Sequence, residues 1–197
     1  MINKNYLKSA NGQVSLIIPL KRSGGHAATI FSKQCVDYSW IKLHRREIHQ
    51  AYSKCPYYDE LHDPYVSMYN DFQDQDLVSI LKQSVEFVTN YLNIENNITE
   101  SDISQLKGSD LVLSQVSGMG GTTYVTGTGG LNYLDHESFK LAGVNIEVGK
   151  YNDIEYPQRK FKNSPDFISG LSILDMLFNL PKDEIVTLLV DNWERVG

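Results

Sequence analysis

The stretch from residue 122 to residue 149 constrains the fold more than any other part of this chain. It reads TTYVTGTGGLNYLDHESFKLAGVNIEVG. β-branched and aromatic residues at its start favour a strand, and alternating apolar residues near its end favour a second one. The predicted elements are a strand (122–126), a glycine turn (127–130), a helix (132–142) ended by a glycine, and a second strand (144–148). This order is a βαβ unit, which places the two strands parallel.

The rest of the chain predicts further helices and few strands. Strands are predicted at 13–20 and 26–32, helices at 40–53, 57–68, 76–92, 109–119, 171–179 and 181–192, and a loop at 154–162. Ser109 is the expected N-cap of its helix. A length of 197 residues suits one core. We therefore predict a single α/β domain over 1–197, with a small mixed or mainly parallel sheet flanked by helices and a helix-rich middle and C-terminus.

Composition excludes several classes of function. The net charge is −6, from 24 acidic and 18 basic residues, which argues against nucleic acid as the main partner and against a polybasic membrane surface. No apolar run approaches the ~20 residues of a membrane helix, and the polar start is unlike a signal peptide. Cys35 and Cys55 do not make a disulfide framework, so we expect reduced thiols and a cytoplasmic location. Ligand spacing for a metal is absent, and no cofactor is predicted.

The glycine turn of the βαβ unit is the first candidate site. Gly127, Thr128, Gly129 and Gly130 lie between a predicted strand and a predicted helix, where backbone N–H groups and a helix N-terminus converge on an anion. The GxGG spacing matches neither the Rossmann nor the Walker fingerprint. A tight turn that simply needs glycine explains the pattern about as well. Tyr133, just beyond, could stack on a sugar or a base, although strand aromatics more often belong to the core.

Two titratable residues, one on an apolar helix face and one at the edge of an apolar stripe, are candidates for acid–base chemistry. His44 lies between Trp40 and Ile48, where it is either a core histidine with one backbone partner or a general acid/base. Asp175 interrupts the apolar run 173–178, which is unfavourable for a carboxylate unless it is paired or exposed. It either orients a histidine, binds a cation or points outward.

The basic run 42–46, KLHRR, contains Arg45. Most charge runs are solvated helix faces. The alternative is a local site for a phosphate or a carboxylate.

Several stretches, in order, resemble the WbqC-like family of bacterial surface-polysaccharide gene clusters. They are Asn3-Lys4-Asn5, Asn11-Gly12, Leu16–Pro19, Trp40–His44, Tyr52–Tyr58, Gly121–Gly127, Tyr133–Asp135 with Phe139, Ala142–Val144, Tyr156-Pro157-Gln158 and Leu171–Asn179. Members of that family normally open with a His-Pro-x-Tyr-Leu-Pro-type segment and a strand rich in Asp and Gln. The chain begins beyond these, so the resemblance implies a shortened member with an exposed sheet edge, which a homo-oligomer or a partner chain would cover.

The resemblance implies a transferase that modifies amino sugars, with glycine or another aminoacyl group as cargo. A sugar nucleotide, or another phosphorylated small molecule, would bind near Gly127–Tyr133, with Gln158 and Arg45 as further contacts. His44 would take the proton from the sugar amine and Asp175 would orient His44. Two alternatives stay open: a non-catalytic module that binds nucleotide sugars, and a structural subunit that pairs through its sheet edge.

Overall fold

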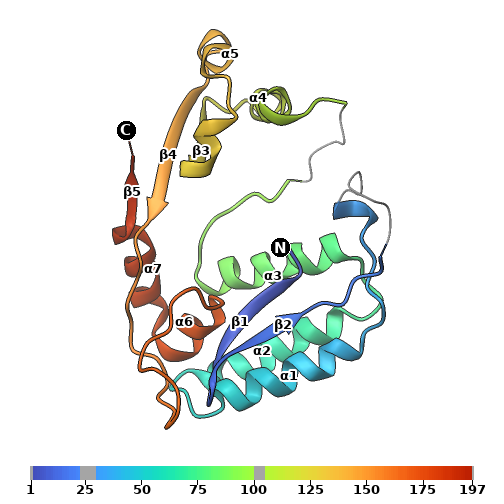
Figure 1. The fold of residues 1–197 in the computed structure, drawn as a ribbon, viewed down its shortest axis with the longest axis vertical. Coiled ribbons are helices and arrows are strands. Elements are labelled where there is room, and N and C mark those ends of the chain that lie inside the picture. Colours follow the sequence, from blue (N-terminus) through green and yellow to red (C-terminus); the bar gives the residue numbers. More distant parts are fainter. Residues whose placement is uncertain (1, 23–29, 100–104, 197) are drawn as a thin grey trace. The chain divides into compact units, whose positions relative to one another are not determined.

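The computed structural model describes residues 2–22, 30–99 and 105–196 (Figure 1). The chain forms two compact units. Unit 1 consists of Met1–Asn96 and Glu155–Thr187, and unit 2 consists of Asn97–Ile154 and Leu188–Gly197. Unit 2 therefore interrupts unit 1 in the sequence, and each unit is built from two separate segments of the chain.

Unit 1 opens with a two-stranded antiparallel hairpin. Strand β1 (Lys4–Ser9) pairs with β2 (Gly12–Ile17), and Tyr6 lies opposite Ser15. The turn closes at Gly12, whose φ of +106° lies in a region that L side chains rarely adopt. Leu7 and Leu16 are buried between the hairpin and its neighbours.

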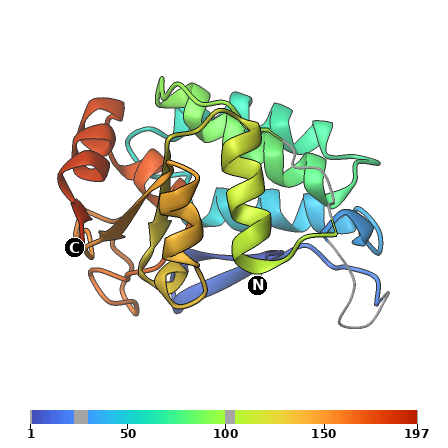
Figure 2. The same ribbon diagram turned by 90° about the horizontal axis from the view of Figure 1, so that it is seen from above.

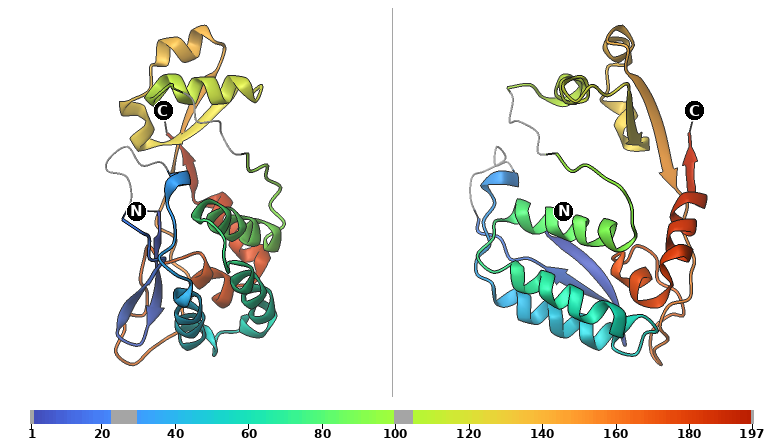
Figure 3. Two further views of the ribbon diagram at one scale, coloured as in Figure 1. Left: turned by 90° about the vertical axis from the view of Figure 1, so that its right-hand side faces the viewer. Right: turned by 180° about the vertical axis from the view of Figure 1, so that it is seen from behind.

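Three helices lie on one side of this hairpin (Figures 2 and 3). Helix α1 (Ser39–Tyr52) contacts both strands, α2 (Tyr58–Asp71) contacts α1, and α3 (Leu77–Tyr91) contacts α2. The Asp76 side chain caps α3 by accepting from the Ser79 N–H at 3.0 Å. The face of α1 predicted to be apolar is buried: Trp40, His44, Ile48, Ala51 and Tyr52.

The second segment of unit 1 returns to the hairpin and completes the core. After an irregular stretch, the Ser172 N–H donates to the Tyr6 carbonyl of β1 at 2.8 Å. Helix α6 (Leu174–Asn179) follows, and then α7 (Lys182–Asp191), whose residues from Leu188 onward belong to unit 2. Phe178 of α6 stacks on Tyr52 of α1, with ring centroids 4.8 Å apart. Residues far apart in sequence therefore share one core.

Unit 2 is a small mixed sheet with two helices. Strands β3 (Thr123–Gly127) and β4 (Asn145–Tyr151) are parallel, and β5 (Trp193–Arg195) is antiparallel to β4. A 3-10 turn, η2 (Thr128–Asn132), follows β3. Helices α4 (Gly108–Gly118) and α5 (His136–Leu141) contribute to a core with Tyr124 and Ile146 of the sheet. The buried centre of that core is Leu134, Phe139 and Val144.

The α/β class, the βαβ unit and the mixed sheet are confirmed. The predicted strand at 26–32 is wrong in the part that is described, because Ile30–Ser32 is a 3-10 turn, η1; residues 26–29 lie outside the described residues. Strands β1 and β5 were not predicted. Compact units can belong to one domain, so the one-domain boundary stays a prediction. Across 2–22, 30–99 and 105–196, no helix is long and apolar enough to cross a membrane.

Two details of unit 2 also correct the sequence prediction. Ser109 is not the N-cap of α4, because that position is Lys107 and no side chain caps it. The Ser109 hydroxyl oxygen instead accepts from the Asp135 N–H at 2.8 Å, which ties α4 to the start of α5. Helix α5 is also shorter than predicted and begins at His136, not at residue 132.

Candidate functional site

A buried acid–base cluster surrounds Asp175 in unit 1. Asp175 is in the first turn of α6 and has no exposed surface. The three residues that follow it are also buried, because this short helix is enclosed on all sides: Met176, Leu177 and Phe178. The sequence thus places a carboxylate where only apolar side chains would normally lie, and such a group needs partners.

The partners of Asp175 come from three other segments. The Tyr156 hydroxyl donates to Oδ2 of Asp175 at 3.0 Å. Oδ1 is buried and has no hydrogen-bond partner within the residues that the structure describes. Tyr52 of α1 and Lys8 of β1 lie near enough to influence the carboxylate electrostatically. The Lys8 ammonium, itself without exposed surface, donates to the Asp166 carbonyl at 2.6 Å.

Burial dominates the electrostatics of this cluster. It raises the pKa of Asp175, while the two tyrosine hydroxyls and the positive charge of Lys8 partly oppose that shift. Burial also lowers the pKa of Lys8. The pKa of the Tyr156 hydroxyl is raised by burial and by the nearby Asp175 charge, so this phenol stays protonated. The cluster therefore combines a carboxylate that accepts a proton readily with a phenol that donates to it.

Tyr156 is the accessible member of the cluster. Its side chain is partly exposed, whereas Asp175 and Lys8 are not. The surrounding loop is held by Gln158, whose amide nitrogen donates to the Ile168 carbonyl and whose amide oxygen accepts from the Ile168 N–H, both at 2.9 Å. Phe167 packs edge-on against the Tyr156 ring at 5.7 Å. Two hydrogen bonds thus tie this loop together beside a partly exposed tyrosine whose hydroxyl is bonded to a buried carboxylate.

His44 and Asp175 do not form the predicted pair. The ring nitrogen Nε2 of His44 lies 3.1 Å from the Ile17 carbonyl oxygen, and Nδ1 lies 3.4 Å from the Tyr69 hydroxyl. Burial lowers the pKa of His44 to about 4, so the ring is neutral at pH 7. Trp40 packs edge-on against it at 4.9 Å. These contacts match a core histidine with a backbone partner, and Asp175 belongs to a different set of contacts.

The glycine loop differs from the geometry that suggested an anion site. Residues 128–132 form the 3-10 turn η2, so no α-helix starts at the glycines. The N-terminus of α5 is capped by the Asp135 carboxylate, which accepts from the N–H groups of Glu137 and Ser138. A negative side chain therefore already occupies that position. Gly130 is glycine for a packing reason, because a Cβ there would collide with the Thr126 side chain.

The other predicted ligand contacts are distributed over both units. Tyr133 belongs to unit 2 and is about half exposed, at 52%. Gln158 belongs to unit 1 and uses both polar atoms of its amide to hold the loop, so a ligand would have to displace those bonds. Arg45 is a partly exposed residue of α1 and donates to the Asn70 side-chain oxygen of α2 at 2.9 Å. Ligand binding by these residues stays a prediction.

Three members of the cluster were missed as site residues: Lys8, Tyr52 and Tyr156. Tyr52 and Tyr156 occur in segments that resemble the family, but neither has a local motif that indicates chemistry. Lys8 lies in β1, which pairs with β2. The burial of the Lys8 side chain depends on the distant segment around Asp166. Only the long-range packing reveals these three. Across the described part of the chain, no group of three or more His, Cys, Asp or Glu side chains could hold a metal ion.

The fold and the cluster define an α/β protein with a buried acid–base group in its larger unit. The model of the WbqC-like protein family matches residues 1–187 of the 197, and the chain belongs to that family. A search of the curated proteins gave no match, and neither did a search of the solved structures.

Proposed function

We propose that this protein is a transferase that attaches an acyl or aminoacyl group to the amine of a nucleotide-linked sugar, in the cytoplasmic synthesis of a surface polysaccharide. The observation that carries the proposal is the Tyr156–Asp175 hydrogen bond of 3.0 Å, which joins a partly exposed phenol to a fully buried carboxylate. Membership of the WbqC-like family supports the substrate class, because the resemblance implies a role in bacterial surface-polysaccharide gene clusters, where amino sugars are modified.

The proposed chemistry is a proton relay. The sugar amine attacks the acyl carbonyl, a C–N bond forms and the bond to the leaving group breaks. The amine proton passes to the Tyr156 oxygen while the Tyr156 proton passes to Asp175, and the return path delivers a proton to the leaving group. The raised pKa of Asp175 suits it to hold that proton, and the raised pKa of Tyr156 prevents a lasting phenolate. Lys8 moderates the buried charge that remains.

Turnover of nucleotide-linked amino sugars with acyl donors, followed by mass spectrometry, tests the relay. We expect Tyr156→Phe and Asp175→Asn each to lower kcat by about 100-fold, the usual size of an acid–base contribution. The control is Tyr151→Phe, which removes a hydroxyl from an exposed tyrosine in unit 2. Full activity in Tyr156→Phe, with an unchanged melting temperature, would contradict the proposed proton relay.

A second candidate function is a binding module without chemistry. The complete burial of Asp175 and Lys8 favours it, because charges without exposed surface can also serve to fix the packing of β1, α1 and α6. This candidate predicts that the wild-type protein is stabilised by nucleotide sugars but produces no modified sugar with any donor.

The third possibility, a subunit that pairs through a sheet edge, is supported by β3, whose outer edge has no strand partner within the described residues.

A further inference from the structure

A groove lies between helices α1 and α2 of unit 1. Its volume is about 560 Å³, within the ~300–1,000 Å³ that small-molecule sites occupy. The two helices run side by side (Figures 1 and 3). The groove is lined by Ile41, Lys42, Arg45, Arg46 and His49 from α1, and by His62, Tyr65 and Val66 from α2. None of these belongs to the cluster around Asp175.

The α1 wall of this groove concentrates positive charge. Lys42, Arg45 and Arg46 supply three permanent cations, and no lining residue is acidic. The chain as a whole carries a net charge of −6, so the groove opposes the overall charge. A hollow lined by one sign of charge attracts small ions of the opposite sign more strongly than a flat surface does. The charge of this wall therefore favours an anion as the ligand.

Two of the three cations keep most of their charge available. Arg46 forms an ion pair with its neighbour Glu47, at 3.0 Å. Arg45 donates to the neutral amide of Asn70 and has no carboxylate partner among the described residues. Lys42 likewise has no ion-pair partner in the described ranges. Arg45 and Lys42 are thus the groups that an incoming anion would meet, and a guanidinium with an ammonium suits a phosphate.

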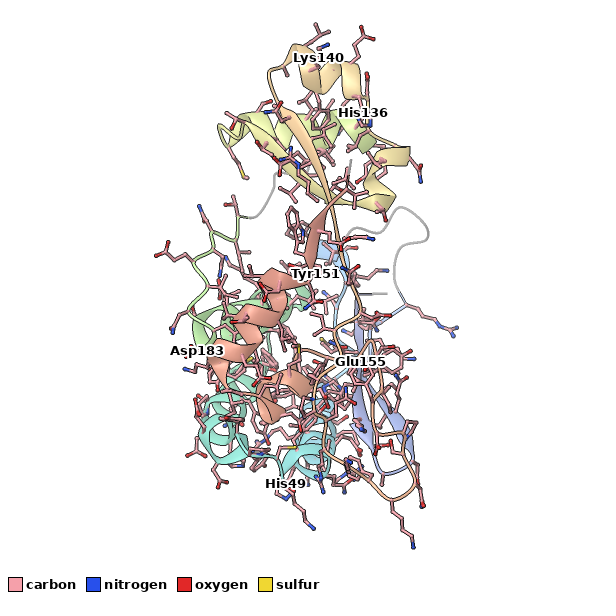
Figure 4. All side chains as sticks on the ribbon, turned by 90° about the vertical axis from the view of Figure 1, so that its left-hand side faces the viewer. His49, His136, Lys140, Tyr151, Glu155 and Asp183 are labelled. Atoms are coloured by element: carbon pink, nitrogen blue, oxygen red, sulfur yellow. The ribbon has the colours of Figure 1, made fainter. Side chains whose placement is uncertain are left out.

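Apart from His49 and His62, the rest of the groove lining is apolar or aromatic, with Ile41 on α1 and Tyr65 and Val66 on α2. Ile41 and Val66 contribute aliphatic surface, and Tyr65 contributes the edge of a nearly buried ring. The Tyr65 hydroxyl lies 3.4 Å from that of Tyr58, which in turn lies 2.7 Å from Nδ1 of His49. Figure 4 labels His49 at the outer side of this helix pair. A hydrogen-bonded chain therefore runs from the floor to the rim, beside the cationic wall.

Helix α1 holds these side chains in place through its other face. Trp40 and Ile48 are nearly or fully buried at 3% and 0% exposure, so the helix cannot rotate about its axis without exposing its core face. The cations follow at positions one, four and five residues after Ile41, which is one side of a helix. The groove is thus preformed on a fixed element, which lowers the entropic cost of binding.

We propose that the α1–α2 groove binds the diphosphate of a nucleoside diphosphate, with Lys42 and Arg45 on the phosphates and the ring system against Ile41, Tyr65 and Val66. The inference rests on the proposed function only in taking a nucleotide-linked sugar as the substrate. A cationic wall beside an apolar one fits a ligand that is charged at one end and aromatic at the other. It places the nucleotide in unit 1, not at the glycine loop of unit 2.

Isothermal titration of the 197-residue protein with uridine diphosphate and with inorganic pyrophosphate tests this site, without donor or acceptor present. We expect Lys42→Gln/Arg45→Gln to weaken binding of both probes at least tenfold. The matched control is Lys140→Gln/Lys162→Gln, which removes the same charge from two exposed positions outside the groove and should change binding less than twofold. Uridine diphosphate should bind more tightly than pyrophosphate, because only it contacts the apolar wall.

Three results would overturn the site: no binding of either probe to the wild type at millimolar concentration, equal weakening in both double variants, or full binding in the groove variant. If the double variant does not fold, the single variant Lys42→Gln replaces it, and we expect it to weaken binding of both probes by a smaller factor. Asp175→Asn should bind both probes normally. Two outcomes separate the groove from the proton relay. Normal binding of both probes, together with full turnover by Tyr156→Phe, would contradict the relay alone. Equal weakening of binding in the groove variant and its control, together with lost turnover in Tyr156→Phe, would contradict the groove alone.

Discussion

At the scale of single residues, burial has opposite effects on the two titratable groups that the sequence singled out. The pKa of His44 is lowered and that of Asp175 is raised, in both cases chiefly by loss of water. The sequence pattern placed His44 on an apolar face, and that placement is confirmed; it placed Asp175 only at the edge of its apolar stripe, whereas the structure buries Asp175 completely. The pattern could not show which partners each would have, because those partners lie on other segments: Ile17 for His44, and Tyr156 for Asp175.

His44→Leu tests the neutral core histidine. With a folded pKa of about 4 against 6.5 when unfolded, His44 contributes stability above pH 6.5 that is lost as the pH falls toward 4. That contribution is at most about 3 kcal/mol. Urea unfolding at several pH values should show a steep loss in the wild type and a much flatter profile in the variant. A parallel pair of profiles would mean that His44 titrates normally.

Asp175→Asn should change the pH dependence in the other direction. Because the folded pKa is raised, the buried carboxylate is more favourable when protonated, and its contribution is present below 3.8 and lost as the pH rises through the folded pKa. The stability of the wild type relative to the variant should therefore increase as the pH falls, by at most about 1.4 kcal/mol per pH unit. His44 cancels in this difference, since both proteins contain it. A difference that does not vary with pH contradicts the raised pKa.

At the scale of elements, regular periodicity was the reliable signal. Helices α1, α2 and α3 and the β3–β4 pair lie close to their predicted ranges, because each has an apolar pattern of its own. Strands β1 and β5 were missed since their pairing depends on other segments: β1 is polar in sequence, and β5 has three residues that pair only with β4. The sequence left a ligand site and a tight turn open for the glycine loop; at Gly130 the structure supplies a packing reason, contact with Thr126, and ligand binding by the loop stays a prediction.

Gly130→Ala and Gly129→Ala separate packing from ligand binding in that loop. A Cβ at Gly130 would collide with Thr126, whereas a Cβ at Gly129 meets nothing within 4 Å. We expect Gly130→Ala to lower the free energy of unfolding by about 1–3 kcal/mol, as overpacking does, and Gly129→Ala to change it little. Thermal melting measures both. If Gly129→Ala instead abolishes stabilisation by a sugar nucleotide while leaving the melting point of the free protein unchanged, the loop is a ligand site after all.

At the scale of the whole molecule, the two units should respond separately to a local loss. Trp193 of β5 lies against Gly149 of β4, where even a Cβ would overlap its indole ring. We expect Trp193→Ala to release β5 and to expose β4 amides to hydrogen exchange, with no change in β1. Val190→Ala, at a side chain 67% exposed, is the control. Equal loss of protection in β1 and β4 would show that the units unfold together.

The interleaving of the two units has a consequence during synthesis. A ribosome that has just completed Asn96 has made the hairpin and α1–α3, but Tyr156 and α6, which complete that core, come only after residues 97–154. The sheet of unit 2 then waits for β5 at Trp193–Arg195. The core of unit 1 is therefore not closed until α6 has been translated, whereas the buried centre of unit 2 is complete once Val144 has been made. Unit 1 therefore presents unfinished apolar surface while residues 97–173 are being made, which is when chaperones would bind it.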